Sequence, residues 1–270
     1  GSRATISGTV TTEASQTVSG VQVSIMTNIP EYPVSVTTGA DGQYSRSEIV
    51  GLDYEVSANK DGDDLNGVST LDLVLIQRHI LGIQTLNSPY KLIAADANND
   101  GKITASDLTD LRKLILGITA ELPKNDSWRF PVVDQNMEAT NPFPFVEAIQ
   151  INDMNQDMAN QNFVAVKIGD VNGNVSTNVS DPSAEGRSNR SMVMSVDEKA
   201  VVAGEVVEIP VTAANFNDVM GFQYTMNLNG ASLVEVQAGK LEMNAANTGD
   251  LGNGVVTMSY ASNEAVTAGT

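Results

Sequence analysis

Two segments of this sequence repeat one another at an offset of 35 residues, so the centre of the chain is expected to fold as a pair of similar units. Each unit begins with a polar, acidic loop and continues as an apolar pattern of helical period, over residues 71–81 and 108–116. Each helical pattern is followed by a glycine, which is typical of a helix C-terminus. The matched positions are Asp61 with Asp96, Val68 with Ile103, Asp72 with Asp107, Leu73 with Leu108, and residues 80–83 with residues 115–118.

The second unit carries oxygen-bearing side chains at the spacing of a calcium-binding loop. Counted from Asp96, they occupy positions one, three, five and twelve, and Gly101 lies at position six, where the chain must turn sharply. Position seven offers a backbone carbonyl, and Ile103 at position eight can anchor the loop in the core. The alternative is an Asx-rich turn that caps a helix. The predicted calcium ligands are Asp96, Asn98, Asp100, Lys102 and Asp107.

The first unit departs from this pattern at its centre. Position five is Leu65, whose side chain cannot bind calcium, and position six is an asparagine instead of a glycine. We expect the loop to be reshaped so that a neighbouring oxygen fills the gap, which predicts an occupied but irregular site; a weak site is the alternative. The candidate ligands are Asp61, Asp63, Asn66 and Asp72, with Asp64 as a substitute for the missing oxygen.

A third segment, residues 170–174, has the alternating oxygen ligands of half a calcium loop. Asp170 and Asn172 are its candidate ligands. They could complete the first site or form a third site between modules, and an ordinary Asn-Gly turn is the competing interpretation.

On either side of the repeat, the sequence has the period of β-strands. The strand-like runs are residues 6–10, 21–25, 34–37 and 54–57 before the repeat, and residues 192–196, 206–211, 221–228 and 255–260 after it. Each group is expected to form an antiparallel β-sandwich. Residues 174–190 are rich in Ser and Asn and are expected to be a linker.

The paired loop-helix pattern of residues 59–118 resembles the dockerin type I family, whose members bind calcium. The wider stretch to residue 173 looks like the extended dockerin-like modules in cell-surface proteins of Bacteroidetes-type bacteria. In dockerins that bind cohesins, the recognition pair lies just before the last calcium ligand. The corresponding pairs here are Thr70-Leu71 and Ala105-Ser106, and because they differ, symmetric two-way binding of a cohesin is not expected.

The flanking segments carry shorter resemblances. Ile6–Val10 and Thr38–Tyr44 resemble transthyretin-like or carboxypeptidase-regulatory-like modules. Val201–Val211, Asn215-Phe216 and Gly221–Tyr224 resemble the first half of a cohesin-like sandwich. The expected fold is mainly β with a small α module: a β-sandwich over 1–58, a dockerin-like module over 59–173, a linker over 174–190, and an incomplete sandwich over 191–270.

Composition excludes several classes of function. Acidic residues outnumber basic ones by 33 to 15, which gives a net charge of −18 and disfavours binding to nucleic acid. The absence of cysteine excludes disulfides, thiolate zinc sites and cysteine nucleophiles. The single histidine, His79, falls on an apolar helix position and is expected to pack rather than catalyse. No apolar run is long enough to span a bilayer, so membrane insertion is not expected.

These features predict a non-catalytic, extracellular, calcium-binding structural protein. The chain ends at Thr270, before the later strands of a cohesin-like sandwich, so a neighbouring copy is expected to supply the missing strand and to build a head-to-tail fibre. A monomeric adhesin or scaffold fragment and an accessory region of a secreted hydrolase are the alternatives. Glycans are possible partners, because Asn-x-Ser patterns occur at Asn125, Asn174, Asn178 and Asn189.

Overall fold

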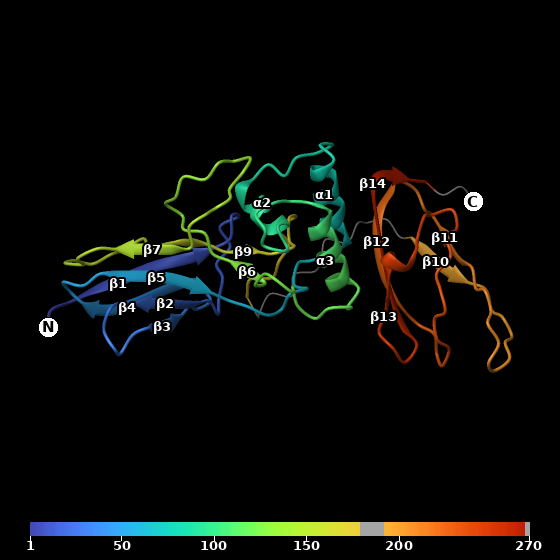
Figure 1. The fold of residues 1–270 in the computed structure, drawn as a ribbon, viewed down its shortest axis with the longest axis horizontal. Helices are drawn as coiled ribbons and strands as arrows, with labels where there is room; N and C mark the ends of the chain where they lie inside the picture. Colours follow the sequence, from blue (N-terminus) through green and yellow to red (C-terminus); the bar gives the residue numbers. More distant parts are fainter. Residues whose placement is uncertain (179–191, 268–270) are drawn as a thin grey trace.

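A computed structural model describes residues 1–178 and 192–267. Two sheets at the N-terminal end, a helical module in the middle and two sheets at the C-terminal end follow one another along its long axis (Figure 1). Among the described residues, none of the helices has the length and apolar character to cross a membrane. The fold is mainly β with a small helical module, as the sequence predicted.

The N-terminal sandwich is built from two sheets with a shared apolar core. One sheet has the order β4-β1-β8, formed by β1 (Arg3–Thr11), β4 (Gln43–Ile49) and β8 (Phe163–Val164). The other has the order β3-β2-β5-β7, formed by β2 (Gln22–Met26), β3 (Val34–Thr37), β5 (Tyr54–Asn59) and β7 (Ala148–Ile151). Alternate residues of these strands, among them Ile6, Val23 and Ile25, are fully buried between the sheets.

The strand pairing divides the chain differently from the expected boundary at residue 58. β7 pairs with β5, and β8 pairs in parallel with β1, so residues 148–164 complete the N-terminal sandwich although they lie beyond the helices in the sequence. A short pair, β6 (Trp128–Arg129) with β9 (Val166–Lys167), connects the sandwich to the helical module. The expected module over residues 59–173 is therefore interrupted by two strands of the first domain.

The helical module contains α1 (Thr70–Ile80), α2 (Pro89–Ala95) and α3 (Ala105–Ile115). α1 and α3 agree with the two predicted helices. Each begins with a capping box, Ser69 with Asp72 and Thr104 with Asp107, and each is followed by a glycine with positive φ. α2 was not predicted from the sequence, although the cap Ser88 and a proline at the first helical position mark its start.

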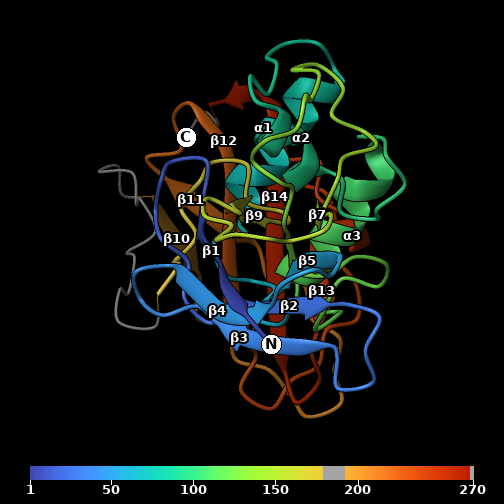
Figure 2. The ribbon, with the colours of Figure 1, turned by 90° about the vertical axis from the view of Figure 1, so that its left-hand side faces the viewer.

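The C-terminal part also contains two sheets. β10 (Val193–Val196) pairs with β11 (Val211–Ala214), and β12 (Val219–Asn227), β14 (Val255–Val266) and β13 (Thr248–Asp250) form a sheet of order β12-β14-β13 beside the short helix η1 (Ala245–Asn247). Of the predicted run 206–211, only Val211 lies in a strand. α1 packs against β12 and β14, which places this sheet directly behind the helices (Figure 2).

The first five residues of the predicted linker over 174–190 are packed against the rest of the chain. Val175 and Thr177 are buried, and the side-chain amide of Asn66 forms two hydrogen bonds with the backbone of Ser176. Residues 174–178 are therefore packed in the structure: Val175 belongs to the core of the N-terminal sandwich, and Ser176 is bonded to Asn66. Residues 179–190 of the predicted linker, including Asn189, lie outside the described residues.

Candidate calcium-binding loops

The loop that joins α2 to α3 is closed by its own acidic side chains. Asp96 caps the C-terminus of α2 and accepts hydrogen bonds from the N–H groups of Asp100 (3.0 Å) and Gly101 (2.9 Å). Asp107 in the first turn of α3 accepts from the N–H groups of Asn98 (3.1 Å) and Thr104 (2.8 Å). Two helix ends thus hold the first and last predicted ligands on opposite sides of one loop.

The backbone of this loop takes the conformation that the spacing predicted. Gly101 has a φ of 76°, in the left-handed region that a glycine adopts without strain, and Asn99 has a φ of 57°. Asn98 Oδ1 accepts from the N–H of Asp100, and Asp100 Oδ1 accepts from the N–H of Lys102. These two bonds hold the backbone of residues 98–102 in a tight turn.

The carboxylates of this loop are crowded, and no basic side chain neutralises them. Burial raises the pKa of Asp96, and repulsion by Asp107 and Asp100 adds to the effect. Burial likewise raises the pKa of Asp107, with a contribution from Asp100. Both ion pairs found in residues 1–178 and 192–267 lie elsewhere. Such a charge distribution suits a hard cation, which would relieve the repulsion.

The donor set of this loop is mixed. In the described part of the chain, no three His, Cys, Asp or Glu side chains converge to form a metal centre by themselves. A calcium loop of this class also takes oxygens from an amide and a backbone carbonyl, which Asn98 and Lys102 supply here. The residues present therefore fit calcium better than a metal that requires an all-carboxylate or imidazole site.

The first loop does not have this arrangement. Asp61 Oδ1 accepts from the N–H of Ser127 (2.8 Å), which lowers the pKa of Asp61, and Asn66 is bonded to Ser176. Asp64 Oδ2 accepts from the N–H of Leu122 (2.9 Å). The side chains of Asp61, Asp64 and Asn66 are thus hydrogen-bonded to other parts of the chain.

Asp72 is instead completed by the segment that follows β9. Its Oδ2 accepts from the N–H of Ser69 (2.9 Å), as Asp107 accepts from Thr104. Its Oδ1 accepts from the N–H groups of Val171 (3.0 Å) and Asn172 (3.2 Å), as Asp107 accepts from Asn98. In this respect residues 170–174 take the place beside Asp72 that residues 96–100 take beside Asp107.

Asp170 has the same role as Asp96. Its carboxylate accepts hydrogen bonds from the N–H groups of Gly173, Asn174 and Val175. The last two lie four and five residues after Asp170, as Asp100 and Gly101 lie four and five residues after Asp96. Burial raises the pKa of Asp170. Burial, followed by repulsion from Asp170, raises the pKa of Asp72 to about 7. The structure therefore gathers Asp72, Asp170 and Asn172 into a second loop that is assembled from two distant segments.

A comparison with protein families decides the identity of this module. Residues 59–116 match the family model of the dockerin type I domain. Residues 59–116 are a dockerin type I domain. The match covers both predicted loops, all three helices and the recognition pairs. No curated protein and no solved structure matches the chain. The transthyretin-like and cohesin-like resemblances of the flanking segments stay predictions.

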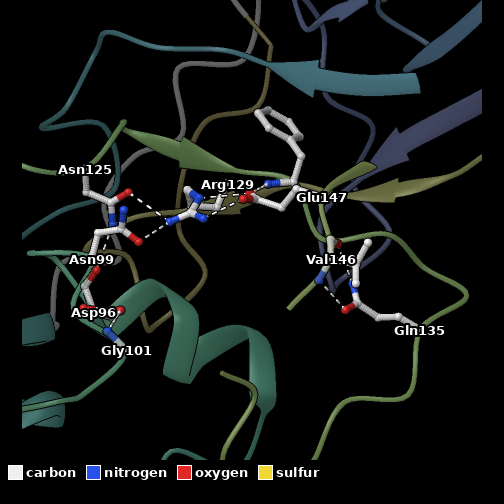
Figure 3. Close-up of polar contacts among 9 residues, drawn as sticks. Asp96, Asn99, Gly101, Asn125, Arg129, Gln135, Val146 and Glu147 are labelled. Carbon is white, nitrogen blue, oxygen red and sulfur yellow. Dashed lines mark hydrogen bonds and ion pairs between the residues drawn. The ribbon is translucent and has the colours of Figure 1, made fainter. Parts of the chain in front are cut away.

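Arg129 ties the second loop of the dockerin domain to the first β-sandwich (Figure 3). Its Nη1 donates to Asn99 Oδ1 (2.6 Å) and Asn125 Oδ1 (3.3 Å), while its Nε and Nη2 bind the carboxylate of Glu147. Asn125 Nδ2 in turn donates to the carbonyl of Asp96 (2.9 Å). Asn125 is one of the predicted glycan acceptors, and its side-chain amide is here hydrogen-bonded to the loop. Sequence spacing gave no signal for this network.

The helices of the dockerin domain contact the C-terminal sheet near the start of α1 and at the end of α3. Thr70, only 3 % exposed, donates from its N–H (2.9 Å) and Oγ1 (2.8 Å) to Gln223 Oε1, and its Oγ1 also bonds Ser259 Oγ (2.8 Å). Gln223 and Ser259 are paired across β12 and β14. At the other end, Thr257 Oγ1 donates to the carbonyl of Leu116 (2.6 Å).

Two glycines permit this close approach. A Cβ added at Gly221 would lie 3.0 Å from Thr70 Cγ2, and one at Gly249 would lie 2.6 Å from the Leu116 carbonyl oxygen. The equivalent recognition pair of the second repeat, Ala105-Ser106, is exposed. Thr70 is therefore buried against the sheet, whereas its counterpart Ala105 is exposed. Whether a cohesin binds in one or two orientations stays a prediction.

Proposed function

We propose that this chain is a non-catalytic, calcium-braced structural protein of the cell exterior, whose dockerin domain binds the C-terminal sheet of its own chain. The observation that carries the proposal is the burial of Thr70 against Gln223 and Ser259. A dockerin type I domain is a calcium-binding interaction module, and here Thr70 of the first predicted recognition pair is already bonded to a β-sheet.

Two calcium ions fit the donor sets of the dockerin domain and the segment after β9. The first ion would be held by Asp96, Asn98, Asp100, Lys102 and Asp107. The second would be held by Asp72, Asp170 and Asn172, a split loop that replaces the irregular loop read from Asp61. Each ion supplies positive charge that offsets the repulsion among buried carboxylates.

The location of these loops gives calcium a mechanical role. Asp107 and Asp72 also cap the N-termini of α3 and α1, so their position fixes the two helices that face the C-terminal sheet. Asp170 lies just after β9, and its loop ties α1 to the strand pair beside the first sandwich. Calcium concentrations are millimolar outside cells, where loops of modest affinity are filled, and this supports an extracellular location.

The test compares two substitutions at equivalent positions of the repeat. Thr70→Arg places a charged side chain in the contact with β12 and β14, whereas Ala105→Arg changes the exposed counterpart 35 residues later. In millimolar calcium, we expect Thr70→Arg to increase the radius of gyration measured by small-angle X-ray scattering and to expose residues 192–267 to proteolysis. Ala105→Arg should leave both unchanged. If neither substitution changes the scattering, the docking proposal is wrong.

A second candidate function is assembly of copies by strand complementation, which would build a fibre. It is favoured by the large apolar side chains that the C-terminal part leaves exposed, with Val202 at 72 % and Val206 at 76 %. Residues 201–210 lie in no strand, although their pattern is that of a strand. A strand from a second copy would pair with this region and cover the valines.

Electron microscopy and light scattering of the purified chain test the second candidate. Filaments that form with increasing concentration and that dissolve when calcium is chelated would support a fibre subunit with copies of itself as partners. Monodisperse particles under all conditions would favour the adhesin or scaffold interpretation. An accessory role in a secreted hydrolase would require a catalytic domain elsewhere in the same protein.

A further inference from the structure

A lysine ammonium is buried inside the first acidic loop of the dockerin domain. Lys167 lies on β9, is 3 % exposed, and enters the module from the strand pair β6-β9. Its Nζ donates to the carbonyl oxygen of Asp64 (2.7 Å) and to its neighbour Ile168 (3.3 Å). A buried charge of this kind is costly unless opposite charge lies close to it.

That opposite charge comes from the residues predicted to bind calcium. The acids that attract the ammonium are, in decreasing order, Asp64, Asp170, Asp63 and Asp61. Burial lowers the pKa of Lys167 to about 8, and these four acids oppose the shift. The geometry places the Lys167 Nζ at the Asp64 carbonyl oxygen, in the position from which its positive charge faces these acids.

The polar groups of the loop are arranged around other partners. Asp61 is held by the N–H of Ser127, Asp64 by the N–H of Leu122, and Asn66 by the backbone of Ser176. None of these bonds requires a metal. The leucine at position five of the loop is 49 % exposed, so the position that should supply an oxygen points to solvent.

We propose that the Lys167 ammonium is the resident cation of the loop Asp61–Asn66 and that it replaces calcium there. The proposal rests on the proposed function only for the contrast with the two loops that are proposed to bind calcium. A divalent ion entering the same loop would be repelled by the ammonium, which is held there by its hydrogen bond to the Asp64 carbonyl oxygen. The same ammonium also attracts Asp170, so we expect it to weaken calcium binding at Asp170 without preventing it. The loop that joins β5 to α1 would then stay ordered when calcium is removed, while the Asp96 loop would loosen.

Calcium stoichiometry gives the first test. The double substitution Asp61→Asn and Asp63→Asn removes two acids of this loop but keeps the shape of both side chains. We expect the number of calcium ions bound, measured by isothermal titration calorimetry and native mass spectrometry, to equal that of the unchanged chain. A loss of one ion would overturn the proposal, because the loop would then be a calcium site. This test does not require any lysine variant to fold.

A double-mutant cycle separates charge from packing. Lys167→Met keeps most of the apolar stem and removes the charge, and Asp64→Asn keeps an acceptor for Leu122 while it removes the attracting carboxylate. We expect Asp64→Asn to lower the Tm of the chain with Lys167 intact, and to leave or raise the Tm in the Lys167→Met background. If the two effects simply add, the lysine acts by packing and the proposal is wrong. Lys124→Met, at an exposed lysine beside the same acidic cleft, is the matched control.

Hydrogen exchange in the presence of a chelator shows which loop depends on calcium, which the Tm values of the double-mutant cycle do not show. In the unchanged chain, the N–H groups of Leu122 and Ser127 should stay protected after calcium removal, whereas those of Asp100 and Gly101 should exchange faster. If all four lose protection together, the first loop depends on calcium and the resident-cation proposal fails. If the loop at Asp96 is also unaffected by chelation, the proposed calcium function fails while the lysine proposal stands.

Discussion

Asp72 and Asp170 are two buried carboxyls that lie far apart in the sequence and share one loop in the structure. The Oδ1 of Asp72 accepts the N–H groups of the two residues that directly follow Asp170. Their mutual repulsion adds to burial in raising the pKa of Asp72. The relationship ties the first helix of the dockerin domain to the strand pair beside the N-terminal sandwich, and it predicts how the module responds to pH and to calcium.

The calcium-free chain should lose stability as the pH rises. The pKa of Asp72 is about 7 when folded and about 3.9 when unfolded, so the folded state binds more protons between these values. The stabilising contribution is therefore complete below about pH 4 and is lost as the pH rises through 7. Thermal unfolding in chelator should give a Tm at pH 5.5 several degrees above that at pH 8.

Calcium should reverse this dependence, because the ion binds the ionised carboxylates and competes with protons. In millimolar calcium, the Tm at pH 8 should equal or exceed that at pH 5.5. Asp72→Asn, which cannot ionise, should flatten the curve measured in chelator. A calcium-free Tm that rises steadily from pH 5 to pH 8 would contradict the assignment of Asp72 as the group responsible.

Asp107→Asn should remove one calcium ion. The substitution keeps the shape of the side chain and one oxygen to accept the capping bond from Thr104, but it removes the charge at the last ligand position. We expect the affinity of this site to fall by at least about tenfold, or about 1.4 kcal/mol. Titration calorimetry measures the loss, and Asp110→Asn on the same helix is the control that should bind calcium normally.

Asp170→Asn should remove the other ion, although Asp170 lies outside the residues that match the dockerin family. The prediction distinguishes a split loop from the continuous loop that begins at Asp61. We expect the number of ions to fall from two to one, measured by native mass spectrometry at saturating calcium. Asp134→Asn, at an exposed acid away from both loops, should leave the stoichiometry unchanged. Unchanged binding in Asp170→Asn would refute the split site.

Arg129→Lys should weaken calcium binding without touching a ligand. Lysine keeps the charge but cannot bind Glu147 with two nitrogens while it also holds Asn99 and Asn125. Asn125 would then position the carbonyl of Asp96 less well. We expect a decrease of about tenfold in affinity at the Asp96 loop. Arg46→Lys, which changes the other arginine–glutamate pair, should have no effect on calcium.

Gly249→Ala should loosen the contact between the dockerin domain and the C-terminal sheet. The added methyl group would lie 2.6 Å from the carbonyl oxygen of Leu116 and 2.5 Å from Thr257 Oγ1, so one of the two must move. We expect a loss of about 1–3 kcal/mol in the free energy of unfolding, measured with denaturant. Gly239→Ala is the control, because nothing lies within 4 Å of its added Cβ.

The sequence alone determined the features that depend on local spacing. The loop from Asp96 to Asp107 could be read directly, because its ligands, its turn glycine and the start of α3 lie within one short segment. The two main helices could be read for the same reason, since their capping residues and terminal glycines lie directly next to the apolar helical pattern in the sequence. Most of the strands before the repeat agree with their predicted runs to within a few residues.

Only the tertiary structure decided which distant segments complete each unit. Spacing grouped Asp61, Asp63 and Asn66 with Asp72 and offered residues 170–174 either as a complement to that site or as a third site. In the folded chain, the N–H groups of residues 171 and 172 bond to Asp72, and the Lys167 ammonium bonds to the Asp64 carbonyl oxygen. The same holds for β7 and β8, which cross the helical module to reach the first sandwich, and for the sheet that covers Thr70. These pairings depend on the burial of surfaces and charges that are far apart in the sequence. A local pattern carries no information about which distant segment will lie close enough to pair with a given strand or polar group.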